Sequence, residues 1–400
     1  MRRHRDQATE IVMVEFSPSG GLFQFGVQLG RALADRVQPV EMWTGPRPEL
    51  DSATTGFEIR SVLPTWHPAD TETRSRVFLL IRRVARAGQL VVAWLVLGAH
   101  LMRTRPRVVL FSHWRFAFEP LFVALYARLL PRTAFALVAH EPFPRSDARD
   151  TSTEKSGRVL TRCFAIAWSS LDAAFVLGSR TRRLVLDRWH PRCEVVVIPH
   201  GDEDVLMSGS PLELVPPSES GPAALFFGTW STYKGIDDLL DAFALVRAEF
   251  PAARLTMAGA VGADIDLAEV LDRAAAIGNV DARPGYLPAD QVSTLLSSAR
   301  VVVAPYIRAS QSGVVHLAYT FGRPVVATNV GDIGDVVQDG HNGLLVAPHD
   351  PGALARAMVV LLRDVELADR FGAAGRNDLD GAWAEAARLV AETLSAVETQ

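Results

Sequence analysis

The sequence contains little cysteine. Among its 400 residues there are two, Cys163 and Cys193, too few for a disulfide framework or for a cysteine-rich metal site. The remaining composition, 48% hydrophobic and 22% charged, is that of a globular protein. A chain of this length exceeds one average domain, so we expect two domains in a reducing cytoplasm.

A secretion signal and a long apolar run are also missing. The basic start, Met1–Arg5, leads into the apolar Ile11–Val14 without the apolar stretch and small-residue cleavage site of a signal peptide. The charge-free run Ala87–Met102 is 16 residues long, whereas a spanning helix needs about 20. We expect this run to form a domain helix, and a helix lying on a membrane surface is the alternative.

Charge is divided unevenly along the chain. Residues 1–200 carry 28 Lys and Arg against 18 Asp and Glu, although the whole chain has a net charge of -4. This division indicates either two surfaces that attract each other or a basic face for an anionic partner, such as an anionic lipid surface at the membrane inner face. The arginines are scattered and no nucleic-acid-binding motif is present, so no nucleic-acid partner is expected.

Short β-branched, apolar runs alternate with helical patterns throughout, which predicts an α/β fold with two doubly wound parallel sheets. In the first half the expected strands are Glu10–Glu15, Val108–His113, Ala134–His140, Ala173–Leu177 and Glu194–Ile198. In the second half they are Ala224–Gly228, Arg254–Ala258, Val280–Ala282, Val301–Pro305, Pro324–Ala327 and Gly343–Val346.

The domain boundaries follow from composition. The serine-, proline- and glycine-rich stretch 206–221 is the expected linker between an N-terminal domain, 1–205, and a C-terminal domain, 222–380. A helical pattern at 381–400 follows, for which packing back on the N-terminal domain is one option.

Two turns in the second half suit a diphosphate. In the first, Gly228 ends a strand, and Lys234 stands before the next helix, where it adds a charge beside exposed N–H groups. In the second, Ser310 and Ser312 can cap a helix whose first turn contains Gly313. Both turns follow the carboxyl ends of strands, where ligands bind in open α/β sheets.

With these motifs the sequence resembles glycosyltransferase family 4, whose members are retaining enzymes of the GT-B type with two Rossmann-like domains facing across a cleft. Phe226–Gly235 is similar to the family's Gly-Arg-x-x-x-x-Lys-Gly segment, and Gly285–Pro288 to its base-contacting loop. Gly322–Thr328, followed by Gly340 and Gly343, is similar to its closing signature.

The resemblance implies roles for particular residues. His140 matches the histidine near the reacting carbon and, with Lys234, is the expected catalytic pair; His113 and His200 are weaker candidates. Gly20 and Gly21 match the glycine loop between donor and acceptor. The implied donor-binding residues are Gly21, Gly228, Thr229, Lys234, Gly285, Tyr286, Leu287, Ser310, Gln311, Ser312, Gly313 and Val314.

The sequence departs from the family pattern at three positions. Thr229 stands where the family has a phosphate-binding arginine, and Ala309 and Leu317 stand where it has the two carboxylates of its Glu-(x)7-Glu motif. The run from Ser310 to Gly313 instead resembles a subset with a Ser-Gln-Ser-Gly helix start. Diphosphate binding is retained in this interpretation, and the sugar-binding and ribose-binding roles of the glutamates are unassigned.

The expected activity is that of a hexosyltransferase that moves a sugar from a UDP- or GDP-sugar to an acceptor hydroxyl, with retention. The acceptor class stays open between a glycan, a lipid-linked sugar and a small molecule. No cofactor or metal is expected, because His and acidic residues lack metal-ligand spacing and the family works without one. Two alternatives are a non-catalytic sugar-nucleotide-binding or scaffolding protein and an oxidoreductase; for the latter, no Gly-x-Gly-x-x-Gly follows the first strand.

Overall fold

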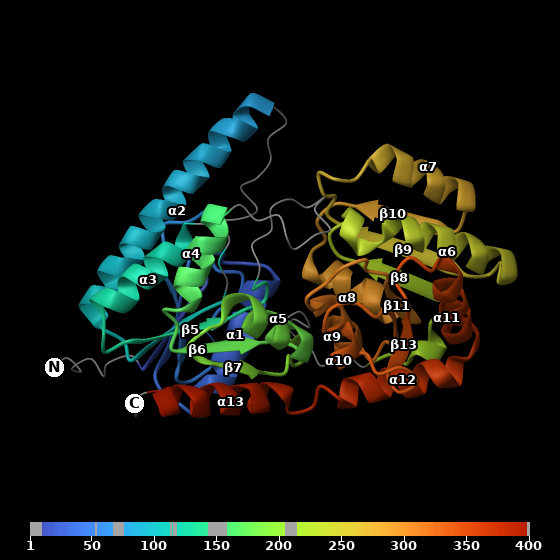
Figure 1. The fold of residues 1–400 in the computed structure, drawn as a ribbon. Helices are drawn as coiled ribbons and strands as arrows, with labels where there is room; N and C mark the ends of the chain where they lie inside the picture. The colour runs from blue at the N-terminus through green and yellow to red at the C-terminus, as the bar shows by residue number, and fades with distance from the viewer. Residues whose placement is uncertain are drawn as a thin grey trace.

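The computed structural model describes residues 10–52, 54–66, 76–112, 114, 118–142, 158–204 and 214–397, with the backbone alone at 76–84 and 289. It contains two separate parallel sheets with helices on their faces (Figure 1), as the sequence predicts. His113 and residues 205–213 of the linker region lie outside the described residues.

The N-terminal sheet has seven strands in the order β3-β2-β1-β4-β5-β6-β7. Their bounds are β1 Ile11–Val14, β2 Val40–Thr44, β3 Phe57–Ser61, β4 Val108–Phe111, β5 Ala134–Val138, β6 Ala173–Val176 and β7 Glu194–Val197. The strand order reverses between β1 and β4, and such a switch point is where open α/β sheets form their ligand crevice.

The C-terminal sheet has six strands in the order β10-β9-β8-β11-β12-β13. Their bounds are β8 Ala223–Phe227, β9 Arg254–Gly259, β10 Val280–Pro284, β11 Val301–Ala304, β12 Val325–Thr328 and β13 Gly343–Val346. Here the order reverses between β8 and β11, so the two turns predicted to bind diphosphate lie side by side at the switch point.

Thirteen α-helices and two described 3₁₀ turns complete the described fold. The first domain contributes α1 Gly21–Ala34, α2 Arg76–Thr104, α3 Glu119–Leu129, α4 Arg158–Trp168 and α5 Ser179–Trp189. From there on the chain forms η3 Pro217–Glu219, η4 Thr232–Lys234, α6 Ile236–Glu249, α7 Leu267–Ile277, α8 Ala289–Ser298, α9 Gly313–Thr320, α10 Ile333–Val336, α11 Pro351–Arg363, α12 Val365–Asn377 and α13 Ala382–Val397.

The sequence pattern missed β2 and β3. In β2 the acidic Glu41 interrupts the apolar run, and it is buried because it accepts hydrogen bonds from Trp43 Nε1 (2.7 Å) and Arg60 (3.2 Å). Strand β3 lies at the edge of the sheet, and its Glu58 and Arg60 side chains are exposed to solvent. Because both strands contain charged residues, a search for apolar runs did not detect them.

The two faces of the N-terminal sheet are covered by different helices. One face packs against α2, α3, α4 and α5, and the other against α1 and α13. Helix α13 thus belongs to the N-terminal core although it is the last element of the chain, and α12 and α13 run along one side of both domains (Figure 1). Trp383 at its start packs on Phe25 of α1 with ring centroids 5.0 Å apart.

Two aspartates of the C-terminal domain cap a helix of the N-terminal domain. Asp332 is buried, and its carboxylate accepts hydrogen bonds from the amides of Arg180 (2.8 Å) and Thr181 (3.1 Å) at the start of α5. Asp335 accepts one from the amide of Ser179 (2.7 Å). An acidic group at a helix N-terminus satisfies amides that the helix itself leaves unpaired. These caps hold the domains together at α5.

A second contact between the domains is a buried polar cluster of His200, Glu203 and His316. His200 Nε2 lies 3.3 Å from a Glu203 carboxylate oxygen, and the two imidazole rings are 4.0 Å apart. Burial raises the pKa of Glu203 to about 7, against a smaller opposing effect of His316, and burial lowers the pKa of both histidines to about 3. The cluster is therefore mainly uncharged between the pKa of the histidines and that of Glu203, which ionises as pH rises through about 7.

The caps make a prediction for stability. We expect Asp332→Ala to destabilise the protein by about 2 kcal/mol, the upper end for a lost helix cap, because two amides of α5 lose their acceptor. Asp335→Ala is the matched control, since Asp335 accepts one exposed hydrogen bond and should cost less. Thermal and urea unfolding measure both; equal losses would contradict the special role of Asp332.

The buried cluster makes a prediction for pH dependence. Between pH 4.5 and 7 the folded protein keeps a Glu203 proton that the unfolded chain releases, so this group lowers stability as pH rises through that window. The loss is of order 3 kcal/mol, since one pKa unit is about 1.4 kcal/mol. Glu203→Gln should remove it, and stability of the variant relative to wild type should therefore increase from pH 5 to pH 7.5.

The histidines titrate in both proteins, so the difference between the two unfolding curves isolates Glu203. Parallel curves across this range would show that Glu203 ionises at its ordinary pKa.

Candidate functional site

Two glycines bring the ends of β8 and β9 together. Gly228 has a φ of 121° and Gly259 a φ of 145°, conformations that residues with a Cβ rarely adopt. A Cβ on Gly259 would lie 1.9 Å from the carbonyl oxygen of Gly228, and one on Gly228 would lie 3.7 Å from Val314. After β8 the chain therefore presents the backbone of a glycine, without a side chain, to the first turn of α9.

Lys234 is the last residue of the short η4 turn rather than the first of a helix. Gly235 follows with φ 71°, and a Cβ there would lie 1.9 Å from the Pro305 carbonyl oxygen. The Lys234 Nζ lies 3.7 Å from the centroid of the Tyr306 ring, a cation–π contact. Among the described residues, no carboxylate forms an ion pair with it.

An aspartate that sequence reasoning missed holds this turn. Asp264 accepts hydrogen bonds from Ser231 Oγ (2.6 Å), the Thr232 amide (2.9 Å) and Thr232 Oγ1 (2.8 Å). Burial acts against ionisation, but these bonds outweigh it and lower the pKa of Asp264. Its position after β9, far from η4 in sequence, gave no local signal.

The turn after β11 leads into α9, and one prediction there is wrong. Ser312 occupies the N-cap position, but its hydroxyl donates to the Tyr306 hydroxyl (3.2 Å) and makes no capping bond. The Val315 amide donates to the Ser312 carbonyl (3.1 Å), and the Gly313 and Val314 amides keep their donors for a ligand. Tyr306 connects this turn to Lys234.

Ser310 and Gln311 form the loop before α9. Ser310 accepts a hydrogen bond at its carbonyl from the Asp332 amide (2.9 Å), and its hydroxyl donates to the His140 carbonyl (3.1 Å), so it joins the two domains instead of capping α9. The side-chain oxygen of Gln311 is buried, and no residue of the described chain donates to it. A buried oxygen without a hydrogen-bond donor lowers the stability of the folded protein, and a ligand that donates to it would remove this cost.

His140 follows β5 and is 4% exposed. Its ring packs edge-on against Phe25 with centroids 4.5 Å apart, and its carbonyl accepts the bond from Ser310. His200, a weaker candidate from the sequence, lies on the other side of Phe25 in the buried cluster. The structure therefore places His140 against the α9 loop, with its ring buried beside Phe25.

The remaining predicted residues come from both domains. At Gly20 and Gly21, where α1 begins, a Cβ would meet no atom within 4 Å, and the Gly20 amide donates to Glu49 (2.9 Å). Tyr286 is 82% exposed. Partial burial and the Glu49 carboxylate raise the pKa of the Tyr286 hydroxyl.

Three further positions complete the comparison with the sequence. Gly285 donates from its amide to Gly259 (2.8 Å), which fixes the loop that contains Leu287. Thr229 is exposed, whereas Leu317 is buried in the C-terminal core. A buried leucine leaves no carboxylate at that position.

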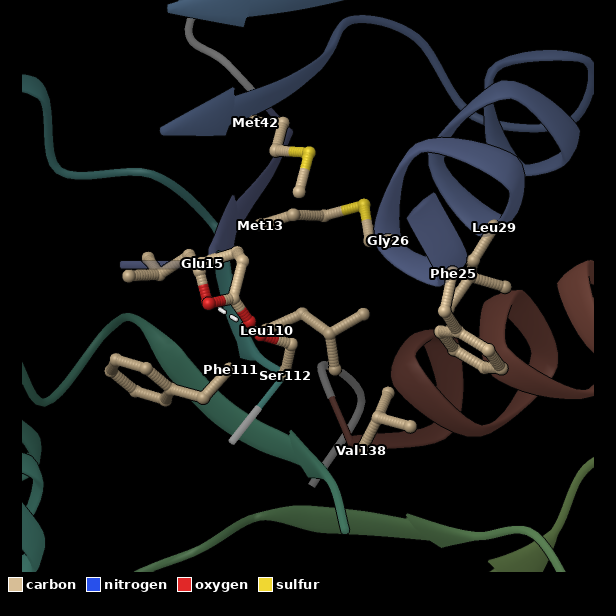
Figure 2. Close-up of a pocket in the computed structure, with 11 residues that line it drawn as sticks. Met13, Glu15, Phe25, Gly26, Leu29, Met42, Leu110, Phe111, Ser112 and Val138 are labelled. Carbon is tan, nitrogen blue, oxygen red and sulfur yellow. Dashed lines mark hydrogen bonds between the residues drawn. The ribbon is translucent and has the colours of Figure 1, made fainter. Parts of the chain in front are cut away.

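A separate cavity lies inside the N-terminal domain between β1, β4 and α1. Figure 2 shows Glu15 and Ser112 pointing toward each other at the strand ends, where they are hydrogen bonded, while apolar side chains such as Met13 and Met42 form the rest of the wall. None of the site residues predicted from sequence is among the described residues that line it.

The described residues contain no group of three His, Cys, Asp or Glu side chains placed to hold a metal ion.

Comparison with known proteins assigns a family to the second domain. Residues 221–364 match the family model for glycosyl transferases, group 1. D-inositol 3-phosphate glycosyltransferase of Streptomyces coelicolor is 33% identical over 182 residues, which cover 43% of this chain and 40% of that protein. Glycogen synthase of Mycobacterium tuberculosis H37Rv is 31% identical over 183 residues, 45% of this chain and 44% of that protein. The chain thus matches less than half the length of these relatives.

Solved structures extend the likeness to both domains. Sucrose-phosphate synthase from Thermosynechococcus elongatus superposes with a TM-score of 0.73 at 19% identity, over 98% of this chain and 99% of that one. HepE of Anabaena in complex with UDP superposes with a TM-score of 0.67 at 16% identity, over 97% and 100%. The chain therefore has the GT-B fold of two Rossmann-like domains, and its residues 221–364 match the group 1 glycosyltransferase model.

Proposed function

We propose that the protein is a family 4 glycosyltransferase that transfers a sugar from a UDP- or GDP-sugar to an acceptor hydroxyl, with retention of anomeric configuration. The acceptor, a glycan, a lipid-linked sugar or a small molecule, binds on the N-terminal domain. The donor needs no metal in this proposal, because Lys234 and backbone amides stabilise the leaving diphosphate.

The observation that carries this proposal is the pair of turns at the switch point of the C-terminal sheet. Gly228 exposes backbone opposite Val314, and the unused amides at the start of α9 lie beside it. Lys234 adds an ammonium without a carboxylate partner in the described chain, held by Tyr306. Amides at a helix start and a nearby cation are the recurring means of binding phosphate.

Lys234 and His140 are the catalytic residues in this proposal. Lys234 and the amides of Ser312 and Gly313 contact the diphosphate, and Gly21 closes over it from the N-terminal domain. Tyr286 and Leu287 border the nucleotide base. His140 contacts the sugar, and the hydrogen bond from Ser310 to its carbonyl fixes its backbone beside the α9 loop.

A second function is favoured by one observation. Leu317 packs in the apolar core at the position where the family has a ribose-binding glutamate. The loss of this family side chain favours a protein that binds sugar nucleotides without turning them over. Thermal-shift measurements with UDP, GDP, ADP and their sugars, followed by product analysis with the donor that binds, distinguish the two. Stabilisation without product formation or donor hydrolysis would favour the non-catalytic function.

The first variant to test is Lys234→Ala. We expect donor turnover to fall at least ~100-fold, as for loss of one preorganised group that stabilises developing charge. The fold should survive, because the lost cation–π contact is worth about 1 kcal/mol. Lys234→Arg keeps the charge but not the compact shape of the ammonium, so it should retain more turnover than Lys234→Ala and less than the wild type. Near wild-type turnover by a stably folded Lys234→Ala protein would show that Lys234 does not bind the diphosphate.

The second variant is His140→Ala. We expect kcat to fall severely while the dissociation constant for UDP or GDP hardly changes, because a group near the reacting carbon stabilises the transition state and not the bound nucleotide. His140 also packs on Phe25, so unfolding must be measured in parallel. Loss of stability and activity together would assign it a structural role; full activity would exclude the catalytic one.

A further inference from the structure

The outward side of α2 is apolar. Val92, Leu95 and Met102 are each about half exposed, and Val91 lies beside them on the same face. No charged residue occurs from Ala87 to Met102. The solvent side of a surface helix normally carries polar residues, so this side of α2 is suited to an apolar environment.

The apolar surface continues on the neighbouring helix. Leu121, Leu125 and Leu129, spaced by four residues, are all exposed along α3, and such spacing places them on one helix face. Helix α3 touches α2, because the Tyr126 hydroxyl donates to the Trp94 carbonyl. Figure 1 shows both helices on the outer side of the N-terminal domain, away from the C-terminal domain. We call these exposed residues of α2 and α3 the outer apolar surface.

The charge around the outer apolar surface has a single sign. The sequences of α2, α3 and α4 contain one acidic residue, Glu119, which is 1% exposed and accepts a hydrogen bond from Trp94 Nε1 (3.2 Å). The exposed arginines are Arg103 at the end of α2, Arg128 near the end of α3, and Arg158 and Arg162 on α4, which packs against α3. Apolar side chains bordered by cations complement an anionic lipid interface.

The packing of α2 suits a position along such an interface and not across it. Its segment Ala85–Thr104 is long and apolar enough to span a membrane, with 33% of the window buried in the protein. The inner side of this segment, including Trp94, Leu97 and Leu101, is fully buried in the core of the N-terminal domain. Crossing a bilayer would take these side chains out of that core, whereas lying on the surface leaves it intact.

We propose that the outer apolar surface docks the N-terminal domain on the surface of an anionic lipid bilayer, with the α2 and α3 side chains among the acyl-chain boundary and the flanking arginines on the headgroups. The partner follows from the charge: an acid-free apolar surface ringed by arginine matches anionic lipid. This inference is independent of the proposed function, since docking requires neither donor nor acceptor. It places the protein at the periphery of a membrane.

The test is binding of the purified full-length protein to vesicles of neutral phosphatidylcholine, with and without anionic phosphatidylglycerol. We expect binding to the anionic vesicles that weakens as salt rises from 0.05 to about 0.5 M, since screening shortens the reach of charge attraction. The double variant Leu95→Glu, Leu125→Glu should bind at least tenfold more weakly. Both side chains are exposed, so the fold should tolerate the change.

The matched control is Leu245→Glu, Val360→Glu, which places the same charge on exposed apolar residues of the C-terminal domain. This control should bind vesicles as wild type does. No binding to anionic vesicles, or equal loss in both double variants, would overturn the proposal. So would sedimentation showing a wild-type dimer that Leu95→Glu, Leu125→Glu converts to a monomer without any vesicle binding, because the surface would then be an interface between copies of the chain.

Discussion

The arrangement of the site depends on the position of one buried carboxylate, that of Asp332. Its side chain caps α5 of the N-terminal domain, while its own amide donates to the carbonyl of Ser310 in the loop before α9. Ser310 in turn donates to the carbonyl of His140. A Cβ on Gly178 would overlap the Asp332 side chain, so the fit is close. One residue therefore sets both the spacing of the domains and the conformation of the α9 loop.

Within the C-terminal domain the same loops are fixed by backbone contacts that admit no side chain. The turn at Gly235 lies against the carbonyl of Pro305, and the turn at Gly331 lies against the carbonyl of Ala309. Both glycines have positive φ, which makes the close approach possible. The amides at this edge of the sheet are thus held in place before any ligand arrives, and donors that need no reorganisation stabilise charge most effectively.

Much of the fold follows from local patterns, and much of the site does not. Eleven strands were predicted from mainly apolar runs, whereas β2 and β3 were missed because they carry charges, such as Glu41, which is bonded to Arg60 of the neighbouring strand. The turns at Gly228 and Lys234 have a local signature of glycine and charge. Asp332 and Asp264 have none, because each accepts hydrogen bonds from residues that are distant in sequence. The buried cluster of Glu203 and His200 likewise includes the distant His316. The burial of His140 likewise depends on α1.

The use of lysine at position 234 is itself informative. The chain has 41 basic residues, of which Lys155 and Lys234 are the lysines, so arginine is the ordinary cation of this protein. The Lys234 ammonium lies 3.7 Å from the Tyr306 ring centroid, in a turn closed by Gly235. A compact ammonium fits there as a point charge with three donors and no fixed plane, whereas a guanidinium needs room for its planar fork. One face of the ammonium meets the ring, and its remaining donors stay available to an oxygen anion beside the start of α9.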